Sequence, residues 1–180
     1  KIYNIRRFVE IDSAKRNSPF KLWKIHGDVH SPKSIMLGLD HYCGSIGKID
    51  SYIKGQYALN NNVKVSSMED KLKSYSDDKG SNNKLDFLSW VELMFFSNIH
   101  IVGFGMDFSE TDLWWVLNKR ARLSKEFKVP NKIYYYVGEM VPSKKLLLES
   151  FDIEVVIVDK GNHTYEGLYD MFLDEIEKRT

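Results

Sequence analysis

Apolar positions in the second half of the chain alternate between strand-like and helix-like segments. The near-continuous apolar runs are "IHIVGFG" from Ile99, "KIYYYVG" from Lys132 and "IEVVIVD" from Ile153. Around them, apolar spacing near 3.6 residues predicts helices over about 86–97, 109–127, 142–150 and 164–179. Strands that are apolar on both faces and alternate with helices are typical of a parallel sheet covered on both sides. The pattern therefore predicts an α/β, Rossmann-like fold with a mainly parallel sheet flanked by helices.

The first half of the chain is less regular. Residues 2–11 alternate imperfectly, and strands are predicted over 21–26 and 34–37, separated by the loop formers of "GDVHSPK". Helical spacing follows over 41–59. Residues 60–85 are mostly polar and predict a partly helical, mobile insertion. We expect residues 1–180 to form a single domain, because this length builds one sizeable core.

Composition and charge exclude several classes of partner. The chain is 43% hydrophobic and 28% charged, and no apolar run approaches the roughly eighteen residues of a membrane span. Its formal net charge of +1 comes from interspersed acids and bases, so neither nucleic acid nor a membrane surface is an expected partner. The one cysteine, Cys43, allows neither an internal disulfide nor a thiolate zinc site, and we expect a cytoplasmic protein in which Cys43 is a buried filler.

The loops after the predicted parallel strands are the first candidate sites, because ligands bind beyond the carboxyl ends of such strands. Gly103 and Gly105 would let a ligand approach the backbone, next to a helix that opens with Ser109 and Asp112 at capping-box spacing. The alternative is a tight strand-to-helix turn. Acids, among them Glu110 and Asp112, crowd this helix start, and the helix dipole alone favours them there.

A second loop, Gly-Asn-His at 161–163, precedes the last predicted helix. Asn162 or Thr164 is a candidate N-cap. The triplet is also similar to one in dinuclear-metal phosphoesterases, but the residues that follow His163 in this sequence contain none of the further histidines that such enzymes need.

His26 is the most conspicuous candidate for chemistry, at the end of the strand predicted over 21–26. Such a position fixes a reacting group while the next loop leaves it accessible, although it is also where an ordinary turn begins. Metal-ligand side chains lie nearby at Asp28, His30, Asp40 and His41. Gly27 and Pro32 break any helix that would align His26 with His30, so no metal site is expected and His30 and His41 are predicted to be loop residues.

Two segments carry a resemblance to a known group of proteins. "KIHGDVHSPKSIMLGLDHY" and, far downstream, "IVGFGMDFSETDLWWVLNKRA" resemble the later half of bacterial sirtuin-like domains, the group associated with NAD hydrolysis in phage defence. The resemblance implies that His26 is catalytic, as a base or water-positioning group, and that Gly27 accompanies it. It implies that Gly103, Phe104 and Gly105 form the turn that touches the ribose of NAD, with Gly105 in place of the usual serine. By position only, Gly161, Asn162 and His163 correspond to the adenine-side loop.

The resemblance also implies what the chain does not do by itself. Deacylating sirtuins carry a four-cysteine zinc module, which one cysteine cannot form, so neither zinc nor deacylation is expected. Residues 1–25 contain no match to the group's glycine-rich phosphate loop or catalytic Asn, so we expect a partial domain with little activity of its own. NAD is then the substrate or ligand, and a homo-oligomer or a fused effector domain are possible partners. The alternative is a non-catalytic Rossmann-like module that binds a nucleotide or a partner.

Overall fold

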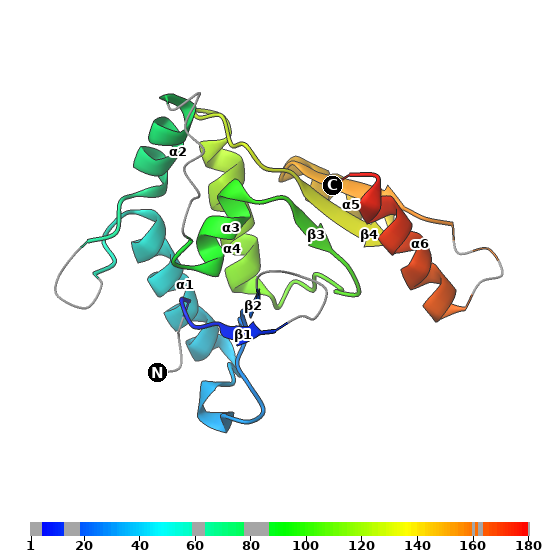
Figure 1. Ribbon diagram of the computed structural model, residues 1–180, viewed down its shortest axis with the longest axis horizontal. Coiled ribbons are helices and arrows are strands. Elements are labelled where there is room, and N and C mark those ends of the chain that lie inside the picture. Colours follow the sequence, from blue (N-terminus) through cyan, green and yellow to red (C-terminus); the bar gives the residue numbers. More distant parts are fainter. Residues whose placement is uncertain are drawn as a thin grey trace.

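The computed structural model describes residues 5–12, 19–58, 64–77, 87–159, 161 and 164–179. Helices α1 to α4 gather in one half of the molecule, and strands β4 and β5 with helices α5 and α6 form the other (Figure 1). The helices are α1 Leu39–Ile53, α2 Met68–Asp77, α3 Trp90–Phe96, α4 Thr111–Leu123, α5 Pro142–Ser150 and α6 Tyr165–Glu177, with a 3-10 turn at Pro32–Ser34. The strands are β1 Val9–Ile11, β2 Phe20–Leu22, β3 Ile99–Ile101, β4 Ile133–Val137 and β5 Ile153–Ile157.

The predicted parallel sheet is confirmed, with strand order β3-β4-β5. Alternate residues of β4 face opposite sides, so the tyrosines Tyr134 and Tyr136 pack under Leu168 and Phe172 of α6. On the other face, Ile133 and Tyr135 share a core with Leu117 of α4 and Leu148 of α5. Helices therefore cover both faces, as the continuous apolar runs predicted.

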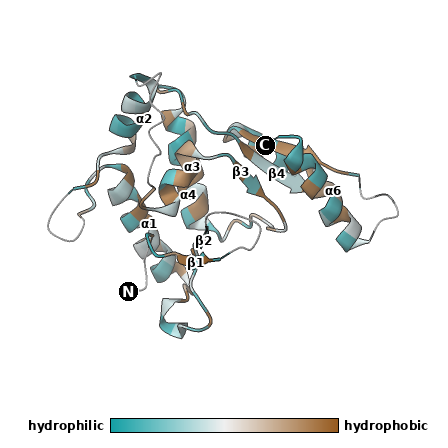
Figure 2. Ribbon diagram, viewed as in Figure 1, coloured by the Kyte–Doolittle hydropathy of each residue, from teal (hydrophilic) through white to brown (hydrophobic). Residues whose placement is uncertain are grey.

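A second core lies in the helical half, and the sequence pattern did not predict it. Its central residues, drawn from all of helices α1 to α4, have no exposed surface: Ile49, Tyr52, Met68, Leu72, Val91, Phe95 and Val116. Figure 2 shows α2 as mostly hydrophilic, and Met68 and Leu72 are the residues that it buries. Helix α4 belongs to both cores, because Val116 faces the helices and its neighbour Leu117 faces the sheet.

Two helix starts follow from side-chain caps. A capping box opens α3: the Ser89 hydroxyl accepts from the Val91 amide at 3.2 Å, and Glu92 accepts from the Ser89 amide at 3.0 Å. Thr164 caps α6, as one of the two predicted alternatives, and Asn162 lies outside the described residues. The capping box predicted from Ser109 is wrong, because α4 begins at Thr111 without a side-chain cap and Asp112 is engaged elsewhere.

Strands predicted in the first half are corrected. The strand expected over 21–26 ends at Leu22 and pairs antiparallel with β1. Residues 34–37 are not a strand, because Ser34 is the last residue of the 3-10 turn that begins at Pro32. The helix predicted over 41–59 is α1, which ends earlier, just before Gly55 with its positive φ of 69°.

Within residues 60–85, α2 confirms the helical part of the predicted insertion, while 60–63 and 78–85 lie outside the described residues. Cys43 is exposed on α1 and is not the buried filler that was predicted. None of the described helices is long and apolar enough to span a membrane.

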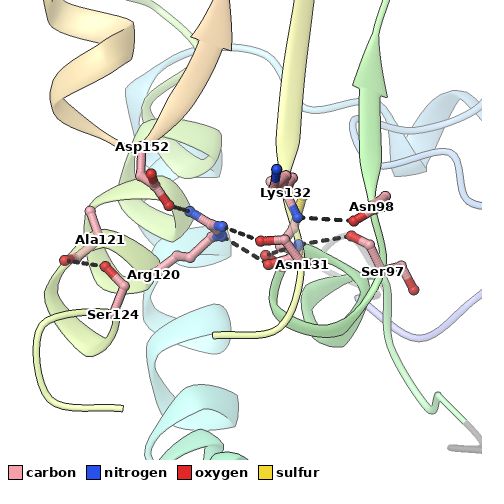
Figure 3. A network of polar contacts seen from close by, with 9 residues as sticks. Ser97, Asn98, Arg120, Ala121, Ser124, Asn131, Lys132 and Asp152 are labelled. Atoms are coloured by element: carbon pink, nitrogen blue, oxygen red, sulfur yellow. Dashed lines mark hydrogen bonds and ion pairs between the residues drawn. The ribbon is translucent and has the colours of Figure 1, made fainter. Parts of the chain in front are cut away.

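One buried cation joins the two halves of the molecule. Arg120 of α4 is 1% exposed, and its guanidinium donates to Asn131 Oδ1 at 3.1 Å and to the Asn131 carbonyl at 2.8 Å. It also reaches Asp152 Oδ2 at 3.2 Å, before β5. The Asn131 amide in turn donates to the carbonyls of Met94 and Ser97, at the end of α3 (Figure 3). Arg120 and Asn131 therefore tie α4 and α3 to the start of β4.

We predict that Arg120→Ala lowers the free energy of unfolding by about 3 kcal/mol or more, because it leaves the buried oxygens of Asn131 without donors. Urea unfolding followed by circular dichroism measures the change. The matched control is Arg122→Ala on the exposed side of the same helix, expected within about 0.5 kcal/mol of wild type. Equal effects of the two substitutions would contradict the role of the network.

Candidate functional site

His26 lies in a tight turn and not at a strand end, because β2 stops at Leu22. Its carbonyl accepts from the Met36 amide at 3.0 Å, which ties the turn to the segment after the 3-10 turn. Gly27 follows with φ +110°, and a Cβ there would lie 2.5 Å from both Ile35 Cα and the Ser34 carbonyl oxygen. The glycine after His26 is therefore required by the crossing of two chain segments.

The imidazole of His26 stands between two carboxylates at the start of α4. Nε2 lies 3.1 Å from Asp112 Oδ1, and Nδ1 lies 3.3 Å from Glu110 Oε2. The Tyr42 ring of α1 meets the imidazole edge-on, with ring centroids 5.5 Å apart. Residues from the His26 loop, α1 and α4 thus converge at one point.

The two carboxylates are held very differently. Asp112 is fully buried, and besides His26 it accepts from the Ser45 hydroxyl of α1 at 3.1 Å and from the Leu113 amide at 2.9 Å. The Glu110 side chain is 17% exposed, and its Oε2 makes no hydrogen bond within the described part of the chain. Its contact with His26 is therefore electrostatic.

This environment favours the imidazolium form of His26. The hydrogen bond with Asp112 raises the pKa of His26 above its ordinary value against the lowering effect of burial, and the charges of Asp112 and Glu110 add to the rise. Burial, with the same two charges, also raises the pKa of the Tyr42 hydroxyl. An imidazolium can donate to both carboxylates at once, whereas a neutral ring can donate to only one.

Within the described part of the chain, a metal ion could be held by His26, Glu110 and Asp112, whose ligand atoms lie within 4.8 Å of one another. One imidazole nitrogen with two carboxylates is a donor set that suits zinc or manganese. In the observed arrangement each ring nitrogen faces a different acid. A single ion would take one ring nitrogen and break the opposite contact, so the geometry matches a hydrogen bond to Asp112 and an ion pair with Glu110 better than coordination.

The histidines and acids near His26 in sequence do not join this cluster. Asp28 pairs with Lys24 at 2.8 Å, and His30 is exposed. His41 lies in the first turn of α1 and not in a loop. Its Nδ1 accepts a hydrogen bond from the Leu37 amide at 2.9 Å.

The predicted glycine turn connects β3 directly to α4, the helix that contacts His26. Gly103 has φ +65°, and a Cβ there would lie 2.6 Å from the Tyr169 hydroxyl of α6. The Phe104 carbonyl accepts from the Tyr135 hydroxyl at 2.9 Å, and the Gly105 carbonyl accepts from the Lys144 ammonium. Side-chain packing thus accounts for Gly103, while the space beside the Gly105 Cα is open.

The third predicted element is not joined to the site. Gly161 follows β5, which β4 separates from β3, and its amide donates to Asp159 Oδ1 at 2.9 Å. Asn162 and His163 lie outside the described residues.

Sequence reasoning missed the partners of His26. Glu110 and Asp112 were attributed to the helix dipole, and their position directly after the glycine turn was the signal that could have found them. Ser45 left no comparable signal, because it is one serine inside a helix.

No protein-family model, curated protein or solved structure matches the chain.

We predict that Gly27→Ala lowers the free energy of unfolding by about 2 kcal/mol or more, because it adds backbone strain and a clash. Gly47→Ala, in the exposed middle of α1 where a Cβ meets nothing within 4 Å, is the control and should raise stability by up to about 1 kcal/mol. Denaturant unfolding compares the two. An unchanged free energy of unfolding in Gly27→Ala would show that the two chain segments can move apart without cost.

Proposed function

We propose that this chain is part of a sirtuin-like, Rossmann-like domain that cleaves the nicotinamide-ribose bond of NAD, with His26 as the catalytic residue and bacterial phage defence as its setting. The supporting observation is the contact between His26 and Asp112, which are 86 residues apart. His26 lies in the first segment of the resemblance and Asp112 in the second. Two segments of one catalytic site would be expected to meet in this way.

The chemistry of the cluster is compatible with this proposal. Departure of nicotinamide passes through an oxocarbenium-like state, and His26 would accept a proton from the ribose or from the attacking water. Such general-base help is worth about 10² to 10⁴ in rate. In the turn that leads to Glu110 and Asp112, the open space at Gly105 would let a ribose hydroxyl approach the backbone.

A specific observation supports the alternative of a non-catalytic module that binds a nucleotide or a partner. Both ring nitrogens of His26 face carboxylates, and the raised pKa of His26 favours the protonated ring, which is no base. In a catalytic cycle, the ring must therefore lose a proton, and one of the two carboxylates must move away from its ring nitrogen.

Nicotinamide release separates the two functions. The longest natural form of the protein is incubated with NAD, and we predict that His26→Ala lowers release by about 10² to 10⁴. His30→Ala, four residues on and exposed, is the matched control and should behave as wild type. Equal release from wild type and His26→Ala, well above background, would remove His26 from the mechanism. No release from wild type, together with NAD binding by calorimetry, would support the binding module.

The glycine turn gives a second prediction. Gly105→Ser adds the hydroxyl that the sirtuin-like turn carries, in a space that is open here, so it should lower KM for NAD about 2- to 10-fold through one hydrogen bond. Gly105→Ala is the control, because it adds the Cβ without the hydroxyl. Steady-state kinetics of the three proteins measures the effect, and an unchanged KM in Gly105→Ser would argue against ribose contact at this turn.

A further inference from the structure

The two carboxylates beside His26 differ in how firmly each of them is fixed in place. Asp112 is fully buried, and its oxygens take the Ser45 hydroxyl and the Leu113 amide as well as His26. The Glu110 side chain is partly exposed, although the Oε2 that faces His26 is buried, and this oxygen makes no hydrogen bond among the described residues. A side chain held at several points orients its partner, whereas one held by charge alone can be displaced.

We propose that Asp112 is the positioning residue of His26, that it keeps the proton of the neutral ring on Nε2, and that Glu110 covers the basic Nδ1 until a ligand hydroxyl or water replaces it. The assignment of Nδ1 as the working nitrogen rests on the proposed function. The placement of the proton on Nε2 is independent of the proposed function.

The electrostatics of the pocket agree with this division. Among the residues that the structure describes, the titratable groups that face the ring are Asp112 of α4, Glu110 just before α4 and Tyr42 of α1. Tyr42 is neutral near pH 7, because burial and the two carboxylates raise the pKa of its hydroxyl. On the loop of His26 itself, Asp28 is paired with Lys24. Once the ring is neutral, its single proton is best placed toward Asp112, because Nε2 and Asp112 Oδ1 already have hydrogen-bond geometry whereas Nδ1 and Glu110 Oε2 do not.

In the reaction, the proton balance is simple. Water forms the new bond to the ribose carbon, and the carbon-nitrogen bond breaks with its electron pair leaving on nicotinamide. The proton of the attacking water moves to Nδ1 of His26. The proton on Nε2 stays there throughout and is donated in a hydrogen bond to Asp112. The carboxylate stabilises the imidazolium that forms.

The first test is a pH titration of His26 by nitrogen-proton NMR, with His26→Gln used for assignment. We expect the Nε2-protonated tautomer when the ring is neutral. Asp112→Asn and Glu110→Gln should each lower the pKa of His26, because each removes a negative charge, whereas the control Asp28→Asn should not change it. A neutral ring protonated on Nδ1, or a titration that Asp112→Asn leaves unchanged, would overturn the proposal.

The second test is the pH dependence of nicotinamide release. Asp112→Asn should lower kcat by about 10² or more, approaching His26→Ala. Glu110→Gln should move the acid limb of kcat/KM to lower pH, because a ring with a lower pKa loses its proton earlier. A loss with Glu110→Gln as large as that of His26→Ala at every pH would overturn its role as a displaceable cover. Absence of release from wild type would refute the proposed function, and the NMR titration would still decide where the proton lies.

Discussion

The structure depends on a buried positive charge at the carboxyl end of α4. Burial lowers the pKa of the Arg120 guanidinium, while the charge of Asp152 opposes that shift, and an arginine stays protonated in either case. The cation must therefore be met by oxygens wherever it is buried. Asn131 accepts hydrogen bonds from this cation, and its side-chain amide donates to carbonyls at the end of α3. The start of β4 therefore cannot shift without breaking contacts with both α4 and α3. The helical half and the sheet half are fixed to each other through this residue pair.

The same helix carries the candidate site at its other end. Asp112 and Arg120 lie roughly 12 Å apart along α4, given the rise of an α-helix. Between them, Val116 and Leu117 pack into different cores. The position of Asp112 is thus set by both halves, and Ser45 of α1 adds a contact from a third direction. His26, in an irregular loop, acquires a defined position because it contacts an element this strongly restrained.

The sequence predicted the sheet half well, because β4 and β5 are apolar runs bounded by clear breaks. The sequence pattern is wrong at residues 23–37, where short apolar runs beside a proline predict strands and the chain forms turns after β2. His26 was identified by its chemistry, but its bond to Asp112 joins residues 86 apart, and such a contact leaves no local pattern. The acids at the start of α4 already had a sufficient local explanation in the helix dipole, which concealed their tertiary role.

The carboxylate pair has a further consequence for the order of events in the proposed reaction. With a neutral His26, Glu110 and Asp112 leave the pocket with two negative charges at short range. The nicotinamide ring of NAD carries a positive charge before cleavage and none afterwards. As the bond breaks, that positive charge passes to the ribose, so the same Coulomb attraction would stabilise the oxocarbenium-like state. Nicotinamide leaves as a neutral molecule, so the carboxylates would attract the remaining ribose cation and no longer the first product.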